Sequence, residues 1–215
     1  MTETQRRRGR PPGTTGVALL AVARGVFLER GYAGTSMEEV ASRAKISKVS
    51  LYREHPSKAR LYAAVVSDWA ASGRDAMRPA VTRMVDNPET KEALLDLAQT
   101  MRDAILSPEV LRMRRLVTSE AENHPEVARN YLADSWDRNI DTLADGLAAL
   151  ADRGRLAVAD PRLAADQFTW LIIGAPLNAQ LLTGESPRRG RPVALSAAVD
   201  LFLAGYQVRS PPPTK

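Results

Sequence analysis

Cysteine is absent from this sequence of 215 residues, and histidine occurs only twice, as His55 and His124. A chain without thiols cannot form a disulfide, a zinc–thiolate site or a thiol nucleophile, and it suits a reducing compartment. The two histidines lie far apart in the sequence. We therefore expect no metal site and no cofactor.

Long apolar runs are missing as well. The most apolar stretch, Phe168 to Leu182, is interrupted by Pro176, Asn178 and Gln180 and is too short to span a bilayer. The N-terminus is basic and polar where a secretory signal would be apolar. These features predict a cytoplasmic protein that does not enter the membrane.

Alternating runs of β-branched residues, which are typical of strands, are not found either. Apolar residues recur instead at helical spacing. Within residues 125–152, for example, they lie alternately four and three residues apart, at Trp136, Ile140, Leu143, Leu147 and Leu150. The sequence therefore predicts an all-α protein.

Acidic residues are sparse at one end only. Residues 1–62 carry twelve Lys and Arg against five Asp and Glu, a charge of +7, whereas the remaining residues carry eighteen against twenty, a charge of −2. A basic N-terminal segment followed by a near-neutral remainder indicates that only the N-terminal segment binds a polyanion. Basic tails also serve solubility alone, so this asymmetry is a weak signal by itself.

Three short helices are expected within this basic N-terminal segment. The first ends at Gly31, a capping box of Ser36 and Glu39 opens the second, and Ser47 caps the third. Such proportions are typical of a helix-turn-helix, in which the first residues of the third helix meet base edges in the major groove. Residues 15–62 are therefore predicted to form a helix-turn-helix DNA-binding domain.

A family resemblance runs through the same segment. It is carried by Phe27, Gly31-Tyr32, Thr35 to Ala41, Ser47 to Arg53 and Pro56-Ser57-Lys58. Over these residues the chain closely resembles the DNA-binding domain of TetR/AcrR-family repressors, where a lysine in the last position contacts phosphate. The motif and the resemblance together imply DNA contacts by Thr35, Ser36, Lys45, Ser47, Lys48, Val49, Ser50, Tyr52, Arg53 and Lys58. Arg8 and Arg10 of the basic arm are further candidates for DNA contact.

Three positions depart from the pattern of that family. Lys45 stands where the turn usually has glycine, and a left-handed residue with a β-carbon there costs roughly 1 kcal/mol. The lysine would bring a further cation to the phosphates in return. Glu54 and His55 replace a His-Phe pair, so no contact is carried over to Glu54, and Ala59 replaces a frequent glutamate.

Later segments resemble one subgroup of the family. Arg114 to Glu126 and Gly154 to Phe168 resemble the AefR-like regulatory domain, which implies a homodimer built on the last two helices. Independently, the helices expected over residues 162–182 and 193–208 are apolar on two faces, which suits packing on the chain's own core and on a second subunit. A monomer with central core helices is the alternative. The expected interface residues are Leu171, Leu182, Ala198, Leu201, Phe202 and Gly205.

These observations predict a ligand-responsive repressor that binds a palindromic DNA operator as a homodimer. A small-molecule effector held within residues 80–185 would change the spacing of the two DNA-binding domains. Its pocket residues would mix apolar bulk with polar groups, and each candidate also suits ordinary core or interface: Met101, Trp136, Asn139, Gln167, Trp170 and Asn178. A DNA-binding regulator or architectural protein without an effector is one alternative. An enzyme is the weaker one, because no nucleophile–base pair or phosphate loop is present.

The pentapeptide Arg-Arg-Gly-Arg-Pro occurs twice, at residues 7–11 and 188–192. In the first copy Arg8 or Arg10 can enter a minor groove, as homeodomain arms do, and the alternative is a solvated tail. The second copy lies between the two helices of the expected dimer and is interpreted as an exposed loop. The expected limits are a basic flexible arm 1–14, the DNA-binding domain 15–62, a helical regulatory and dimerisation domain 63–209 and a disordered tail 210–215.

Neutralising each pentapeptide in turn separates these two roles. Replacing Arg7, Arg8 and Arg10 with alanine removes up to three contacts per subunit, and each lost phosphate contact flattens the plot of log K against log salt concentration by about 0.9. The slope should therefore fall by several units. The same change at the three arginines of residues 188–192 is the matched control and should leave the slope nearly unchanged. Salt titrations on one DNA fragment measure both variants, and equal slope losses would contradict the assignment.

Overall fold

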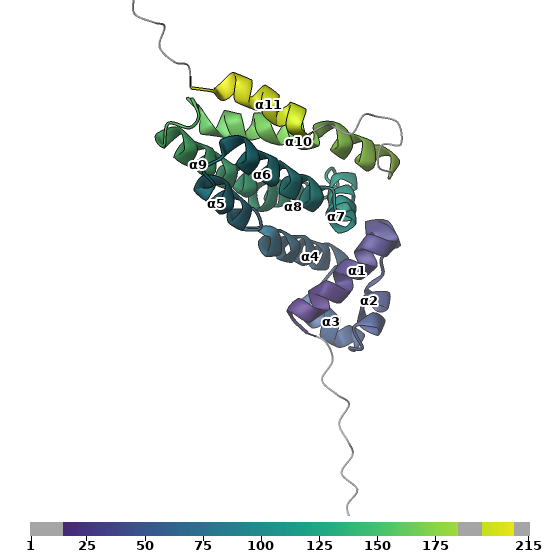
Figure 1. Cartoon of the computed structure of the whole chain (residues 1–215). Coiled ribbons are helices and arrows are strands. Elements are labelled where there is room, and N and C mark those ends of the chain that lie inside the picture. Colours follow the sequence, from purple (N-terminus) through teal and green to yellow (C-terminus); the bar gives the residue numbers. More distant parts are fainter. Residues whose placement is uncertain (1–14, 185–194, 209–215) are drawn as a thin grey trace, which may run out of the picture. The chain divides into compact units, whose positions relative to one another are not determined.

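The computed structural model describes residues 15–184 and 195–208 (Figure 1). These residues fold into α-helices and one π-helical segment, with no strand among them, so the predicted all-α fold is confirmed. The chain forms two compact units, of which the first ends at Trp69 and the second begins at Ala70. Within the described ranges, no helix is both long and apolar enough to cross a membrane.

The first unit starts each of its short helices at a local signal in the sequence. Ser36 accepts a hydrogen bond from the backbone N–H of Glu39, and Ser47 accepts one from that of Ser50. Gly31 interrupts the first helix as predicted, with φ of 69°, and one more turn follows it. The helices are α1 (Val17–Gly34), α2 (Met37–Arg43), α3 (Lys48–Glu54) and most of α4 (Lys58–Gly73).

An aromatic cluster forms the core of this unit. The ring centroid of Tyr62 lies 5.7 Å from that of Phe27 and 5.2 Å from that of Tyr32. Leu51 is completely buried and is the buried residue that α3 contributes. Because a single leucine anchors α3, its remaining side chains stay at or near the surface.

The second unit is a bundle of longer helices. Proline occupies the first turn of α7, α8 and α10, where its missing N–H costs nothing. Figure 1 shows α10 (green) running beside α11 (yellow), with α6 and α9 packed along the same bundle. Its elements are α5 (Arg78–Asp86), α6 (Thr90–Ile105), α7 (Pro108–Ser119), α8 (Pro125–Tyr131), η1 (Leu132–Asp137), α9 (Arg138–Asp152), α10 (Pro161–Thr183) and α11 (Leu195–Tyr206).

The expected single apolar stripe over residues 125–152 is interrupted. The helical path continues from α8 to α9 through the π-helical segment η1. Ile140, Leu143 and Leu147 are buried as the spacing predicts, whereas Trp136 lies inside η1 and is only half-buried. A π-helical turn holds extra backbone per turn, so it rotates Trp136 away from the straight continuation of the stripe.

Candidate functional site

The helix α3 presents a polar and partly apolar surface to solvent. Val49 is 78% exposed and Tyr52 is 43% exposed, and Lys48 and Arg53 are exposed beside them. An exposed valine has no packing role within its own unit. It suits apolar contact with a thymine methyl group, while a lysine donates to guanine acceptors in the major groove.

The turn that precedes α3 has the backbone that the sequence predicts. Lys45 has φ of 57°, which confirms the left-handed residue expected there. Its neighbour Ile46 donates its N–H to the carbonyl of Ala41 at 3.0 Å, the hydrogen bond that closes a helix C-terminus of this type. Since Lys45 is exposed and lies three residues before the start of α3, its ammonium is accessible to solvent in that turn.

Thr35 and Ser36, expected together at a DNA contact, do different work. Thr35 is only 3% exposed, and its hydroxyl donates to the carbonyl of Gly31 at 2.7 Å. Its side chain is turned inward in this structure, and a DNA contact by this residue stays a prediction. Ser36 is exposed and caps α2.

Lys58, which is expected to contact phosphate, has its ammonium bonded within its own unit in this structure. Its ammonium donates to the carbonyls of Tyr32, Ala33 and Thr35 at 2.9, 3.3 and 3.1 Å. It also lies 4.6 Å from the ring centroid of Tyr32. An ammonium has three N–H donors, and all three are used here within the protein. Lys58 therefore fixes the end of α1 in this structure.

Lys48, at the start of α3, is paired with a carboxylate. Its ammonium lies 2.9 Å from Oε1 of Glu38 on α2, and the hydrogen bond from Lys48 is the main cause that lowers the pKa of Glu38. No local signal in the sequence identifies the pair, because the turn alone brings α2 and α3 together.

The expected pocket residues do not form one site. Met101, Trp136 and Asn139 line a small cavity of about 30 Å³ in the second unit. Gln167 and Trp170 line a different and more open groove, and Asn178 is exposed and lines neither of them. Five of the six expected residues are therefore divided between two places, and Asn178 belongs to neither.

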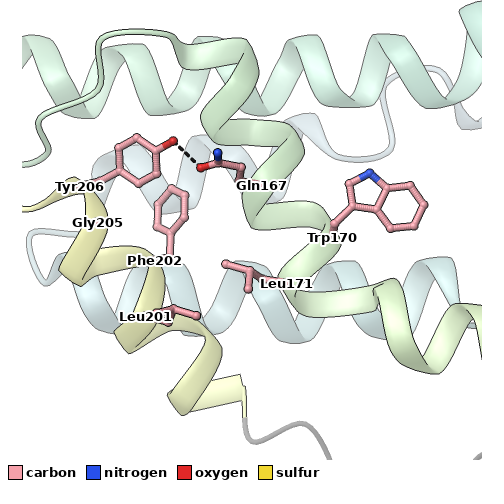
Figure 2. Close-up of a pocket in the computed structure, with 7 residues that line it drawn as sticks. All are labelled: Gln167, Trp170, Leu171, Leu201, Phe202, Gly205 and Tyr206. Carbon is pink, nitrogen blue, oxygen red and sulfur yellow. Dashed lines mark hydrogen bonds between the residues drawn. The ribbon is translucent and has the colours of Figure 1, made fainter.

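The open groove lies between α10 and α11 and has a volume of about 490 Å³ (Figure 2). Leu201 is 63% exposed and Trp170 is 52% exposed. At one end the hydroxyl of Tyr206 donates to Oε1 of Gln167 at 2.6 Å. The groove thus combines large exposed apolar side chains with a polar end. Its lining residues are Gln167, Trp170, Leu171, Leu201, Phe202, Gly205 and Tyr206.

The expected interface residues divide between this groove and the core. Leu171, Leu201 and Gly205 line the groove, whereas Phe202 forms part of its wall but is only 2% exposed. Ala198 is buried within its own unit at 8% exposure and does not line the groove, so its place at an interface stays a prediction. Leu182 is exposed near the end of α10, away from the groove lining.

The two copies of the repeated pentapeptide lie outside the described residues. Arg8 and Arg10 belong to residues 1–14, and the second copy belongs to residues 185–194. Their expected roles stay predictions from the sequence.

Known protein families match both units. Residues 19–65 match the family "Bacterial regulatory proteins, tetR family", and residues 92–208 match "AefR-like transcriptional repressor, C-terminal domain". The uncharacterized HTH-type transcriptional regulator YezE of Bacillus subtilis is 31% identical over 144 residues, which are 65% of this chain and 72% of that protein. The HTH-type transcriptional activator FasR of Mycolicibacterium smegmatis is 36% identical over 78 residues, or 36% of either chain.

Solved structures are similar over most of the chain. A TetR-family transcriptional regulator from Mesorhizobium loti has a TM-score of 0.82 and 29% identity, covering 88% of this chain and 95% of that one. The flavonoid-responsive regulator FrrA has a TM-score of 0.66 and 27% identity, covering 89% and 96%. The similarity therefore includes both units of the fold.

The pairing of Glu38 with Lys48 leads to a prediction for Glu38→Gln. The variant releases the ammonium and removes a negative charge beside the DNA-facing helix, so affinity for a duplex of arbitrary sequence should rise by about two- to fivefold. Glu92→Gln on α6 removes the same charge in the second unit and is the control. Fluorescence anisotropy at fixed salt measures both. An unchanged or weaker affinity for Glu38→Gln would show that Glu38 does not compete with DNA for Lys48.

Proposed function

This chain belongs to the TetR family of transcriptional regulators, and from that premise we propose that it is a homodimeric repressor released from a palindromic operator by a small-molecule effector. It is a DNA-binding regulator and not an enzyme. We place its action in the cytoplasm, together with the DNA. The observation that carries the proposal is the outward face of α3, where Lys48, Val49 and Tyr52 stand exposed on a helix anchored by Leu51.

We assign reading and positioning to different side chains of the first unit. Lys48 and Val49 offer a donor and an apolar contact to base edges. Tyr52 and Lys45 offer a hydroxyl and an ammonium to phosphate oxygens, which fix register without reading sequence. Ser47 and Ser50 are linked through their hydroxyls at 2.9 Å, so they stabilise the start of α3 and contribute to base contact only if that link opens. Arg53 extends the basic surface.

We assign the dimer interface to the groove between α10 and α11. Leu201 and Trp170 expose apolar surface there, and large exposed apolar residues that gather on one surface are typical of interaction sites. An isologous contact places the same groove of a second subunit against it. Two subunits related by a two-fold axis then read two half-sites, which is why we expect the operator to be palindromic.

The family match of the second unit, described as an AefR-like transcriptional repressor, supports repression. The response to an effector is supported by the similar regulator FrrA, which is described as flavonoid-responsive. FasR is described as an activator, which favours a second candidate, namely activation through the same DNA-binding unit. Transcription from an operator-bearing promoter, with and without the protein, distinguishes repression from activation.

Leu201→Asp tests the assembly on which this function depends. A carboxylate in the apolar groove would be desolvated at the interface, so light scattering at micromolar concentration should show a monomer where the wild type is a dimer. Affinity for a palindromic operator should fall by at least about tenfold. Leu132→Asp is the matched control, since Leu132 is also an exposed leucine, at 51%, but does not line the groove.

A wild-type monomer at this concentration would contradict the proposed homodimer. A Leu201→Asp dimer of normal DNA affinity would instead show that the interface lies elsewhere on the chain. The control keeps these outcomes separate from a general effect of added charge, because both variants lose a leucine and gain a carboxylate.

A further inference from the structure

Thr169 on α10 differs from other threonines in the helices of this chain. Thr100, Thr142 and Thr183 each donate their hydroxyl to the carbonyl four residues earlier, at 2.9 Å. Thr169 is 1% exposed, and its hydroxyl has no hydrogen-bond partner. Buried polar atoms nearly always have a partner. The hydroxyl of Thr169 is therefore buried and makes no such bond to its own helix backbone.

A second unpartnered polar atom lies at the same place. The side-chain amide of Asn139 donates to the carbonyl of Ser135 at 2.7 Å, which fixes the orientation of the amide group. Its Oδ1 atom is then buried without a partner. Ser135 belongs to the π-helical segment η1, and π-helical turns occur frequently at functional sites. Asn139 and Thr169 come from different helices and both line the cavity of about 30 Å³.

The rest of the cavity wall is apolar. It consists of Met77, Met101, Ile105, Trp136, Ile140 and Leu143. Oδ1 of an asparagine accepts hydrogen bonds only, whereas a threonine hydroxyl both donates and accepts. An occupant must therefore offer a hydrogen-bond donor at one point and apolar surface elsewhere. Methionine sulfur and an indole ring both favour contact with an aromatic ring, and an ionised group would lose its hydration without gaining a countercharge in the lining.

We propose that this cavity binds a small neutral aromatic compound with a hydroxyl donor, of the phenol type. The donor meets Oδ1 of Asn139, the hydroxyl of Thr169 accepts or donates beside it, and the ring lies among Met77, Met101 and Trp136. This inference rests on the proposed function only in treating the bound compound as the effector. Binding itself is a property of the second unit and is measured without DNA.

The cavity must open to admit such a ring. Its volume is about 30 Å³, whereas an engineered protein cavity that binds benzene has about 150 Å³. Methionine side chains, with three rotatable bonds, adapt readily to a new neighbour. Trp136 also forms part of the wall, and its ring lies 5.6 Å from the ring of Trp170 in the groove between α10 and α11. A displaced Trp136 therefore acts directly on the proposed dimer interface.

Calorimetric titration of the full chain with p-ethylphenol tests the binding site. The comparison compounds are p-ethylanisole, which has the same ring but no donor, and p-ethylbenzoate, which is an anion. We expect saturable binding of p-ethylphenol, at least about tenfold tighter than either comparison compound, because an unmatched buried acceptor costs affinity. Equal affinity for p-ethylanisole, tighter binding of the anion, or no saturable binding of p-ethylphenol would overturn the proposal.

Two variants tie the binding to the cavity. Thr169→Val and Asn139→Leu keep the number of side-chain heavy atoms and remove the polar atoms, and each should weaken binding of p-ethylphenol by about tenfold. Thr100→Val on α6 removes a hydroxyl that is already bonded to its own helix, and it should bind like the wild type. Thermal unfolding checks that all three fold. Thr169→Val should melt no lower than the wild type, because it removes a buried hydroxyl that has no hydrogen-bond partner. Unchanged binding of p-ethylphenol by this folded variant would contradict the proposed site.

The failure of this inference can be distinguished from failure of the proposed function. If p-ethylphenol binds through Asn139 and Thr169 but leaves DNA affinity unchanged, the binding site stands and release by this class of effector is wrong. If DNA binding is released by other compounds while p-ethylphenol does not bind, the proposed function stands and the cavity assignment fails.

Discussion

The ammonium of Lys58 holds together the segments on which the DNA-binding unit depends. It joins the start of α4 to the carbonyls of Tyr32, Ala33 and Thr35, which end α1 and lead into α2. Hydrogen bonds from a charged donor are roughly twice as strong as neutral ones, and the ring of Tyr32 adds a cation–π contact. Leu51 in turn is completely buried and anchors α3 in the same unit. The position of α3 therefore depends on these contacts.

The sequence predicted the features of this unit that depend on neighbouring residues. The caps at Ser36 and Ser47 and the break at Gly31 follow from local backbone chemistry. The left-handed Lys45 was expected from the family resemblance, which has glycine at that turn. The orientation of Thr35 and Lys58 did not follow. A threonine or lysine near a helix terminus can turn outward to phosphate or inward to a carbonyl, and the packing of distant segments decides which direction it takes. The pairing of Glu38 with Lys48 was missed for the same reason.

In the second unit, too, the sequence predicted some features and missed others. Helical spacing predicted buried Ile140 and Leu143, and the two-faced character of the last helices agrees with a helix pair that leaves an apolar groove at its surface. The π-helical segment has no signal that the spacing of apolar residues reveals, because the pattern passes through it almost unchanged. Its consequences are nevertheless large, since it places Trp136 and Ser135 beside the cavity. Thr169, whose unsatisfied hydroxyl identifies that cavity, is indistinguishable in sequence from threonines that bond to their own helix.

The central claim is that two copies of this chain read DNA together through α3. Selection of bound fragments from random double-stranded DNA, followed by sequencing, tests it most directly. The account predicts an enriched palindrome whose half-sites are separated by about one helical turn, 10–10.5 base pairs, or a multiple of it. Enrichment of a single unpaired half-site, or no enrichment over the starting pool, would contradict the account.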